Sequence, residues 1–340
     1  MYSKLLHRYT AFLIFSVVIL IMAGALVTST KSGLSVPDWP NTYGYNMYTF
    51  PFSMWVGGIF YEHLHRLIAS GIGFLTIILV FLIHKFEQRK WVKKLSWIAL
   101  VTVCFQGLLG GLTVLFLLPD LISTFHATLA QTFFCLIITT HIIQTKWWHN
   151  QSSFDNSTNL ESISKLSKIS LIVFGIIYFQ LIFGAWMRHT ESGLAVPDFP
   201  LSYGQIFPSL NSENLEQYNN LQIKKNIRLY ADGPLSSFQI MYHMIHRTWA
   251  YVVVIGIIFL FIKLKKTSNN IFPKKIKTIS LILILMVCSQ FILGILTVLT
   301  GKSVFITTTH VVLGALTLGL TWGLTLSLLR IKKVASSYLK

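Results

Sequence analysis

Charged residues are scarce in this sequence of 340 residues, and acidic residues are especially few. Only 11% of the residues are Asp, Glu, Lys or Arg, whereas 53% are hydrophobic, and there are only 11 Asp and Glu. Soluble globular domains have about 25% charged residues. The composition therefore excludes a soluble enzyme or a soluble binding domain and predicts an integral membrane protein.

Cysteine is also nearly absent. The three cysteines, Cys104, Cys135 and Cys288, lie inside hydrophobic runs, and the segments between the runs contain none. A disulfide between outer loops is therefore excluded, even though an outer compartment would permit one. Buried thiols of this kind are usually small packing residues, so we expect no reactive cysteine.

Long hydrophobic runs take the place of charge. A helix of about 20 apolar residues crosses ~30 Å of hydrocarbon, and a helix satisfies its own backbone hydrogen bonds there. The first run has a basic start like a signal peptide, but it is long and lacks a small-residue cleavage site, so we expect it to be retained. The sequence predicts eight membrane-spanning helices, at about 9–30, 62–84, 95–117, 121–145, 168–189, 239–262, 278–299 and 304–329.

The formal net charge of +17 reflects membrane orientation and does not indicate a nucleic-acid partner. Twenty of the 28 Lys and Arg lie in five short segments that eight helices place on one side: 1–8, 85–94, 146–168, 263–277 and 329–340. The positive-inside rule assigns this side to the cytoplasm. We therefore expect a multi-pass protein of the inner (plasma) membrane of the cell, with both termini cytoplasmic.

The sequence repeats itself over a long range. Residues 24–40, "GALVTSTKSGLSVPDWP", match residues 184–200, "GAWMRHTESGLAVPDFP". Residues 106–115, "QGLLGGLTVL", match residues 290–299, "QFILGILTVL". Because histidines recur in the same order between these segments, the chain is predicted to be a duplication of a four-helix unit.

The predicted fold class is therefore all-α, with eight transmembrane helices in two repeated four-helix bundles. Four crossings return the chain to its starting side, so the bundles should be related by a pseudo-twofold axis along the membrane normal. We expect one bundle at 1–150, a cytoplasmic linker at 151–168, and a second bundle at 169–340.

A polar nonapeptide stands in each repeat, "SGLSVPDWP" at 32–40 and "SGLAVPDFP" at 192–200. We expect Gly33 and Gly193 to form left-handed helix caps, and the prolines to stop the helices from continuing. Two interpretations stay open for these segments. Each forms a rigid turn that closes the outer end of a bundle, or each contacts the substrate directly.

Four histidines are the strongest functional candidates: His65, His126, His246 and His310. Each lies near the outer end of an even-numbered helix and has a counterpart in the other repeat. Ionisable residues inside membrane helices are costly and usually functional. Two neutral imidazoles that face each other across a bundle are a usual way to hold a haem iron. Copper and zinc are weaker interpretations, because neither half adds the Cys, Met or carboxylate ligands typical of such sites.

Three further residues accompany the histidines. Arg66 and Arg247 each follow a histidine directly and could pair with haem propionates, or extend to the membrane interface. Glu62 lies one turn before His65, and its counterpart in the second repeat is His243. An ion pair between Glu62 and Arg66 is the alternative to a catalytic carboxylate. The asymmetry predicts that the first bundle handles a reacting molecule and the second holds a permanent electron-transfer haem.

These motifs together resemble the haem A synthase family. The resemblance rests on the 24–40 segment, "EHLHR" at 62–66, "FHATLAQ" at 125–131, "HMIHR" at 243–247 and "THVVLGA" at 309–315, in a repeat of four plus four helices. It implies a membrane oxidoreductase that converts haem O to haem A by oxidising a ring methyl group to a formyl group.

The resemblance also implies specific roles for the candidate residues. His65 and His126 would be associated with the substrate haem, His246 and His310 with a bound b-type haem, and Glu62 with catalysis. It further implies haem O synthase and the cytochrome oxidase assembly machinery as partners, with an unknown electron donor and membrane lipid around the protein. Many relatives carry a cysteine pair in an outer loop, and this chain does not.

Two other classes of function remain open. A bis-histidine cytochrome b-type electron-transfer subunit would use both haems without changing either. A transporter would also fit a membrane repeat. Against the transporter, no predicted helix is obviously interrupted in mid-membrane.

Overall fold

Eight long helices dominate the computed structural model, which describes residues 3–149, 160–227, 233–267 and 274–338. In this part of the chain, eight helices are long and apolar enough to cross a membrane, which confirms the predicted number. They are α1 (Lys4–Ser29), α2 (Gly57–Phe86), α3 (Lys90–Leu115), α4 (Asp120–Ile142), α6 (Leu160–His189), α8 (Ser237–Thr267), α9 (Lys274–Leu299) and α10 (Val304–Tyr338).

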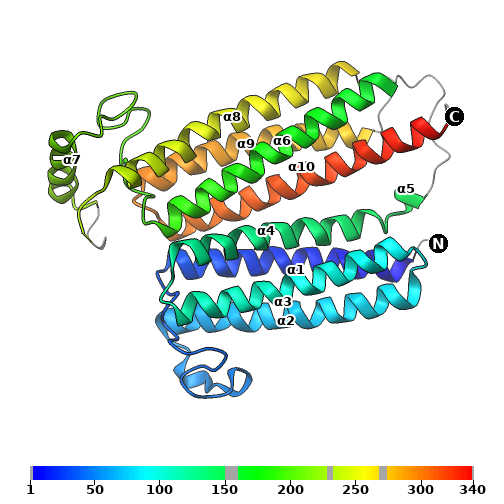
Figure 1. Ribbon diagram of the computed structural model, residues 1–340, viewed down its shortest axis with the longest axis horizontal. Helices are drawn as coiled ribbons and strands as arrows, with labels where there is room; N and C mark the ends of the chain where they lie inside the picture. Colours follow the sequence, from blue (N-terminus) through cyan, green and yellow to red (C-terminus); the bar gives the residue numbers. More distant parts are fainter. Residues whose placement is uncertain (1–2, 150–159, 228–232, 268–273, 339–340) are drawn as a thin grey trace.

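The helices form two four-helix bundles, α1–α4 and α6 with α8–α10 (Figure 1). In the first bundle α1 and α3 each pack against both α2 and α4, so α2 and α4 lie diagonally across it. In the second bundle α6 and α9 each pack against α8 and α10, which are likewise diagonal. Both chain ends lie at the same end of the molecule, opposite the long loops (Figure 1). The predicted pseudo-twofold axis stays a prediction.

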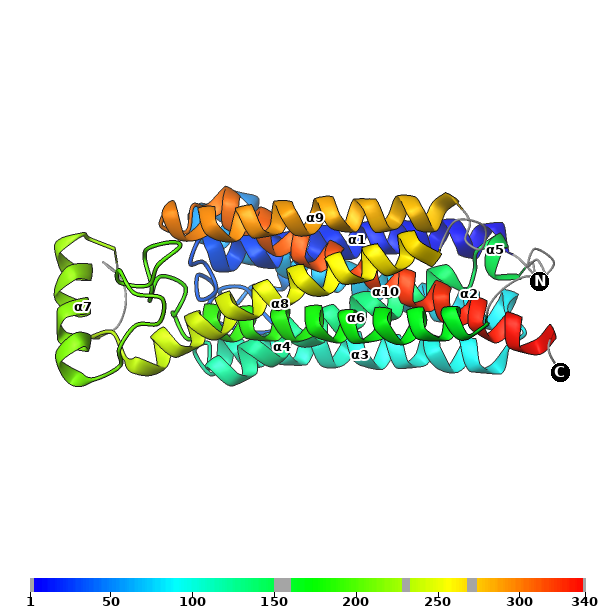
Figure 2. The same ribbon diagram turned by 90° about the horizontal axis from the view of Figure 1, so that it is seen from above.

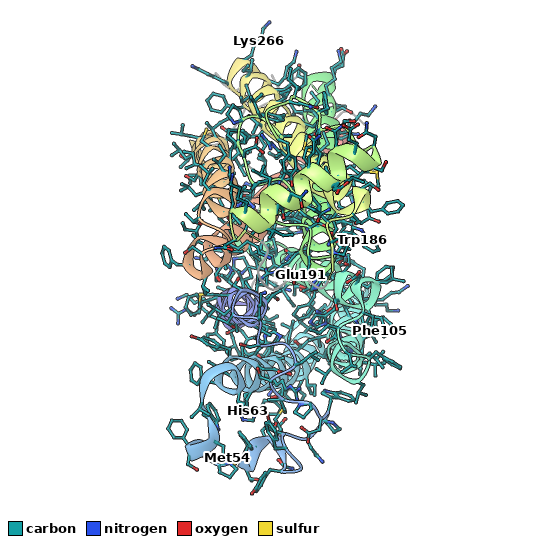
Figure 3. All side chains as sticks on the ribbon, turned by 90° about the vertical axis from the view of Figure 1, so that its left-hand side faces the viewer. Met54, His63, Phe105, Trp186, Glu191 and Lys266 are labelled. Carbon is teal, nitrogen blue, oxygen red and sulfur yellow. The ribbon has the colours of Figure 1, made fainter. Side chains whose placement is uncertain are left out.

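The bundles meet along α1 and α4 on one side and α6 and α10 on the other. Figure 3 looks along the helices and shows Glu191 at the junction of the two bundles. Polar contacts cross this junction: Trp322 Nε1 donates to Thr139 Oγ1 at 2.8 Å, and Arg188 Nη2 donates to the Ala25 carbonyl at 2.9 Å. Hydrogen bonds of this kind hold helices together in lipid, where apolar contact alone gives little preference.

The helix α6 begins at Leu160, about two turns earlier than the hydrophobic run predicts. No helix breaker stands in these turns, and an ion pair of 2.6 Å between Glu161 and Lys165 supports the helix beyond the apolar segment. The predicted linker 151–168 is therefore helical from residue 160 onward, and its remainder lies outside the described residues. The predicted bundle boundaries at 150 and 169 stay predictions.

The long loop 190–238 contains a helix that the sequence analysis did not predict, α7 (Ser212–Lys224). Asn211 caps it by accepting a hydrogen bond from the backbone N–H of Asn214 at 2.9 Å. The ring of Tyr218 stacks on Tyr203 with centroids 3.8 Å apart, which fixes α7 to the repeated turn. Figure 2 shows α7 beyond the ends of the long helices.

The left-handed helix caps were assigned to the wrong residues. Lys31 and Glu191 adopt positive φ angles, of 56° and 51°, whereas Gly33 and Gly193 do not. The N–H of Ser32 donates to a carbonyl of the last turn of α1 at 2.8 Å, so the chain reverses before it reaches the glycine. This is the hydrogen-bond pattern of a helix C-cap whose left-handed position is filled by a residue other than glycine.

Candidate functional site

The four predicted histidines lie on diagonal helices, two in each bundle. His65 is on α2 and His126 on α4, while His246 is on α8 and His310 on α10. His65 and His126 lie within electrostatic reach of each other, and so do His246 and His310. Each bundle therefore brings together the two imidazoles that the sequence pattern paired.

Each histidine ring lies against a glycine of a neighbouring helix, which is α1, α3, α6 or α9. A Cβ atom added to the glycine would stand closer to the ring carbon Cε1 than ordinary contacts allow. The distances are 3.0 Å for Gly24 and His65, 3.1 Å for Gly110 and His126, 2.8 Å for Gly184 and His246, and 3.2 Å for Gly294 and His310. The four glycines therefore leave the room that the imidazole rings occupy.

A glutamine one turn before the glycine holds three of the four histidines. Its side-chain amide donates to the carbonyl of the histidine in three places: Gln106 to His126 at 2.8 Å, Gln180 to His246 at 3.1 Å, and Gln290 to His310 at 2.8 Å. The equivalent position before Gly24 is Leu20. His65 is therefore the one of the four that lacks this glutamine contact.

The ring nitrogens show whether these residues fit a haem. The Nδ1 atoms of His65, His246 and His310 are buried and have no hydrogen-bond partner among the described residues. His126 Nδ1 instead lies 3.2 Å from the Gln106 carbonyl and 3.1 Å from Gln106 Nε2, so Gln106 orients this ring. Neutral imidazoles in pairs, backed by glycine in an apolar bundle, fit the axial ligation of a haem iron. The described residues contain no group of three or more His, Cys, Asp or Glu placed to hold a metal ion, so each site offers a pair.

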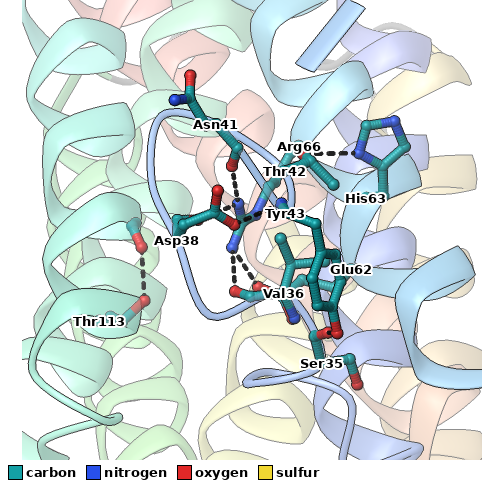
Figure 4. A network of polar contacts seen from close by, with 11 residues as sticks. Ser35, Val36, Asp38, Asn41, Thr42, Tyr43, Glu62, His63, Arg66 and Thr113 are labelled. Atoms are coloured by element: carbon teal, nitrogen blue, oxygen red, sulfur yellow. Dashed lines mark hydrogen bonds and ion pairs between the residues drawn. The ribbon is translucent and has the colours of Figure 1, made fainter. Parts of the chain in front are cut away.

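Glu62 lies beside this site, buried between α2 and the first nonapeptide. Its side chain accepts two hydrogen bonds, one at 2.5 Å from Arg66 Nη2 and one at 2.8 Å from the backbone N–H of Val36 (Figure 4). Only 3% of the residue is exposed. The ion pair that the sequence left as an alternative is therefore present, and the catalytic role of Glu62 stays a prediction.

Arg66 joins the loop to the helix through a set of backbone carbonyls. Nη1 donates to Asp38 at 2.7 Å and to Asn41 at 3.1 Å, and Nη2 donates to Val36 at 2.8 Å. Together with Glu62, these acceptors surround the guanidinium group (Figure 4). Arg66 is thus a loop anchor in this structure, and its predicted contact with a haem propionate stays a prediction.

Arg247 has the same position in the second bundle. Nη1 donates to the carbonyls of Asp198 and Leu201, at 3.1 Å and 3.2 Å, and Nη2 donates to Pro200. Its guanidinium carbon lies 4.7 Å from the ring centroid of Phe199. Two of the three carbonyl contacts of Arg66 recur here, at the equivalent residues Asp198 and Leu201, but without a carboxylate. The propionate role of Arg247 also stays a prediction.

In each repeated turn, an aspartate side chain accepts hydrogen bonds from two backbone N–H groups that follow it in the chain. Asp38 accepts hydrogen bonds from the backbone N–H groups of Tyr43 and Gly44, at 2.7 Å and 2.8 Å. Burial acts to raise the pKa of Asp38, but these hydrogen bonds and the charge of Arg66 outweigh it and lower the pKa. Asp198 makes the same contacts in the second turn. The rigid-turn interpretation of the nonapeptides accounts for these contacts.

The counterpart of Glu62 also holds a loop. His243 Nδ1 lies 3.1 Å from the carbonyl of Ser192, and only 3% of the residue is exposed. The position therefore anchors the outer turn in both bundles, through Val36 in the first and Ser192 in the second. Only the first bundle adds a buried carboxylate and its ion pair.

The chain is similar to known proteins over most of its length. Residues 7–322 match the COX15-CtaA family, described as Cytochrome oxidase assembly protein. A Heme A synthase of Halalkalibacterium halodurans is 27% identical over 298 residues, which cover 86% of this chain and 87% of the relative. A Heme A synthase of Alkalihalophilus pseudofirmus is 27% identical over 314 residues, 90% of this chain and 92% of the relative. One of Flavobacterium psychrophilum is 28% identical over 330 residues, 87% of this chain and 90% of the relative.

The chain belongs to the haem A synthase family. This confirms the resemblance inferred from the motifs, and the relatives confirm the prediction of an enzyme, an oxidoreductase. It also supports a link to cytochrome oxidase assembly.

One buried histidine next to Glu62 was not selected in the sequence analysis. His63 is fully buried between Phe50 and Trp55, with ring centroids 4.9 Å and 4.6 Å away, and its Nδ1 lies 3.1 Å from Thr42 Oγ1. When "EHLHR" is aligned with "HMIHR", His65 matches His246, whereas His63 matches Met244. Because the analysis relied on residues shared by both repeats, it passed over His63.

Proposed function

We propose that this protein oxidises a ring methyl group of haem O to a formyl group and so produces haem A. Membership of the haem A synthase family supports the reaction. Within this chain, the proposal rests on one repeated arrangement. A histidine ring packs against a glycine at four places, two in each bundle. The two histidines of each bundle would supply the axial ligands of one haem, which gives two haems in the protein.

The two bundles have different tasks in this proposal. His65 and His126 would hold the substrate haem O, and His246 and His310 would hold a resident haem b. A b-type haem supplies reversible transfer of single electrons when it is bound. The asymmetry supports this division, because among the described residues Glu62 is a buried carboxylate one turn from a proposed haem ligand, and its counterpart in the second bundle is His243.

The residues around the first site suggest how the chain assists the reaction. The turn held by Glu62 and Arg66 covers the outer end of the bundle and excludes water from it. Glu62 supplies a negative charge near the substrate and can accept or relay a proton through a carboxylate oxygen. His243, its counterpart, carries no such charge, which fits a bundle that only transfers electrons.

Haem extraction tests the reaction directly. The protein is expressed in cells that make haem O but lack any other source of haem A, and the pigments are extracted and separated by chromatography. Appearance of haem A, dependent on this chain, is expected. Recovery of unchanged haem O beside a normal b-type spectrum would instead identify an electron-transfer cytochrome.

The surroundings of the protein follow from the same proposal. Haem O is its substrate, haem O synthase and the cytochrome oxidase assembly machinery are its partners, and an external donor supplies electrons. The positive-inside pattern places both termini in the cytoplasm and the repeated turns outside the plasma membrane. Cysteines introduced at the exposed positions Ser53 and Ser212 should label with a membrane-impermeant reagent in intact cells, above the wild-type background. Labelling only after permeabilisation would reverse the orientation.

A further inference from the structure

A pocket that the proposed reaction does not use lies near the end of the molecule that carries both termini. Its volume is about 410 Å³, within the range of ~300–1,000 Å³ typical of small-ligand sites. Its lining comes from both bundles: the α2–α3 turn and α3, the short helix α5 (Lys146–His149), and α10. The residues that matter for its chemistry are Arg89, Trp91, Trp148, Leu329, Arg330 and Lys333.

The pocket is lined by three cationic side chains, Arg89, Arg330 and Lys333. Arg89 is neutralised by the carboxylate of Glu87, to which Nε and Nη2 donate at 2.9 Å and 2.6 Å. In the described part of the chain, no carboxylate forms an ion pair with Arg330 or Lys333. Two cations therefore line the same cavity, and neither forms an ion pair with a carboxylate of the described residues.

Arg330 is held in place for binding. Its Nη2 donates to the Trp148 carbonyl at 3.0 Å, and its guanidinium carbon lies 5.2 Å from the centroid of the Trp148 ring. An arginine fixed in this way loses little side-chain entropy when it binds an anion, and its other N–H groups remain to donate to phosphate oxygens.

Apart from His149, the remaining lining residues are apolar (Trp91, Leu326 and Leu329), and we expect them to lie at the membrane surface. Trp91 is 50% exposed and Leu329 is 37% exposed, although both lie near the ends of membrane-spanning helices. Tryptophan at this depth is typical of the interface between hydrocarbon and headgroups. A pocket that combines two cations with exposed apolar side chains matches an amphiphile, whereas a soluble anion would leave the apolar part unused.

We infer that this pocket binds an anionic phospholipid at the junction of the two bundles. Arg330 and Lys333 contact the phosphate group, and the acyl chains extend along Leu329 and Trp91. Basic pockets between transmembrane helices are known sites for such headgroups. Because α3 and α10 belong to different bundles, the lipid joins them, and it does so whether or not the proposed haem chemistry is correct.

Lipid titration of the purified full-length protein tests this site. The protein in neutral detergent is titrated with phosphatidylglycerol or phosphatidylcholine, and the bound lipid is counted by native mass spectrometry. Phosphatidylglycerol should bind more tightly. Lys333→Gln should weaken it roughly 5-fold, and Arg330→Gln with Lys333→Gln roughly 25-fold, since each cation near an anionic headgroup contributes ~1 kcal/mol. Lys265→Gln with Lys266→Gln removes the same charge from α8 at the same end and should change binding less than about 2-fold.

Three outcomes would overturn the inference. Equal loss in the α8 control pair would show a general charge effect. Equal affinity for the two lipids would show that the headgroup charge does not matter. Displacement of phosphatidylglycerol by an equal concentration of inorganic phosphate would identify a site for a soluble anion. The exposed Lys333 carries the test if Arg330→Gln disturbs the contact with Trp148.

Discussion

The Oε1 atom of Glu62 lies 2.5 Å from Nη2 of Arg66, one helical turn away on α2. Both side chains are almost completely buried, with 4% and 9% of their surfaces exposed. The pair also holds the backbone of Val36 from both sides, since Glu62 accepts its N–H and Arg66 donates to its carbonyl. One ion pair therefore links the outer turn to the helix that carries His65.

Glu62→Gln separates the charge of this residue from its contacts. Glutamine keeps an oxygen that can accept a hydrogen bond from Val36 or Arg66, but it cannot carry a charge or take up a proton. We expect normal insertion and a normal resident haem spectrum, with loss of haem A and accumulation of haem O or a partly oxidised product. Chromatography of extracted haems measures this. His243→Gln is the matched control, and it should leave haem A production intact.

Ordinary haem A output from Glu62→Gln would end the catalytic assignment. Glu62 would then be an anchor for the turn, as His243 is in the second bundle.

Arg66→Gln should destabilise the protein more than Arg247→Gln does. Both changes remove several hydrogen bonds to loop carbonyls, but only the first leaves a buried carboxylate without its partner. Breaking a buried ion pair from one side costs about 3–5 kcal/mol. We expect a lower unfolding temperature and lower yield for Arg66→Gln, measured by thermal denaturation in detergent. Similar losses in both variants would mean that the carbonyl contacts, and not the ion pair, dominate.

Gly184→Ala should disturb the resident haem site. The added Cβ would lie 2.8 Å from Cε1 of His246, so the ring or the helix must shift. We expect a reduced haem content or a shifted low-spin spectrum, because small displacements in a packed interior cost about 1–3 kcal/mol. Gly175→Ala is the control on the same helix, since nothing lies within 4 Å of its added Cβ. An unchanged spectrum in Gly184→Ala would show that the contact with Gly184 does not position His246.

Hydropathy and charge predicted most of the fold. The eight spans follow from apolar length alone, because lipid offers the backbone no other partner. The first turns of α6 and the helix α7 were missed because they are rich in polar residues, and a search for long apolar runs does not detect such helices. Lys31 was missed as the left-handed cap because sequence reasoning assigns that position to glycine by default.

Part of the candidate site was predictable and part was not. The repeat identified His65 and its counterparts, because the order and spacing of residues can be read directly from the sequence. Gly24 and Gly184 lie inside the quoted repeat. Their contacts with histidine rings depend on helix packing, which the spacing of residues in the sequence does not reveal. Arg66 anchors the turn because the loop folds back onto α2, and a helical sequence pattern does not predict the path of a loop.

The division of labour between the bundles is the central claim, and one measurement tests it most directly. The reduced-minus-oxidised absorption spectrum is recorded for purified His310→Ala and His65→Ala at equal protein concentration. His310→Ala removes a proposed axial ligand of the resident haem, so its low-spin spectrum should be lost or shifted, whereas His65→Ala should keep most of it. If His65→Ala abolishes the spectrum and His310→Ala leaves it intact, the assignment of the two bundles is reversed.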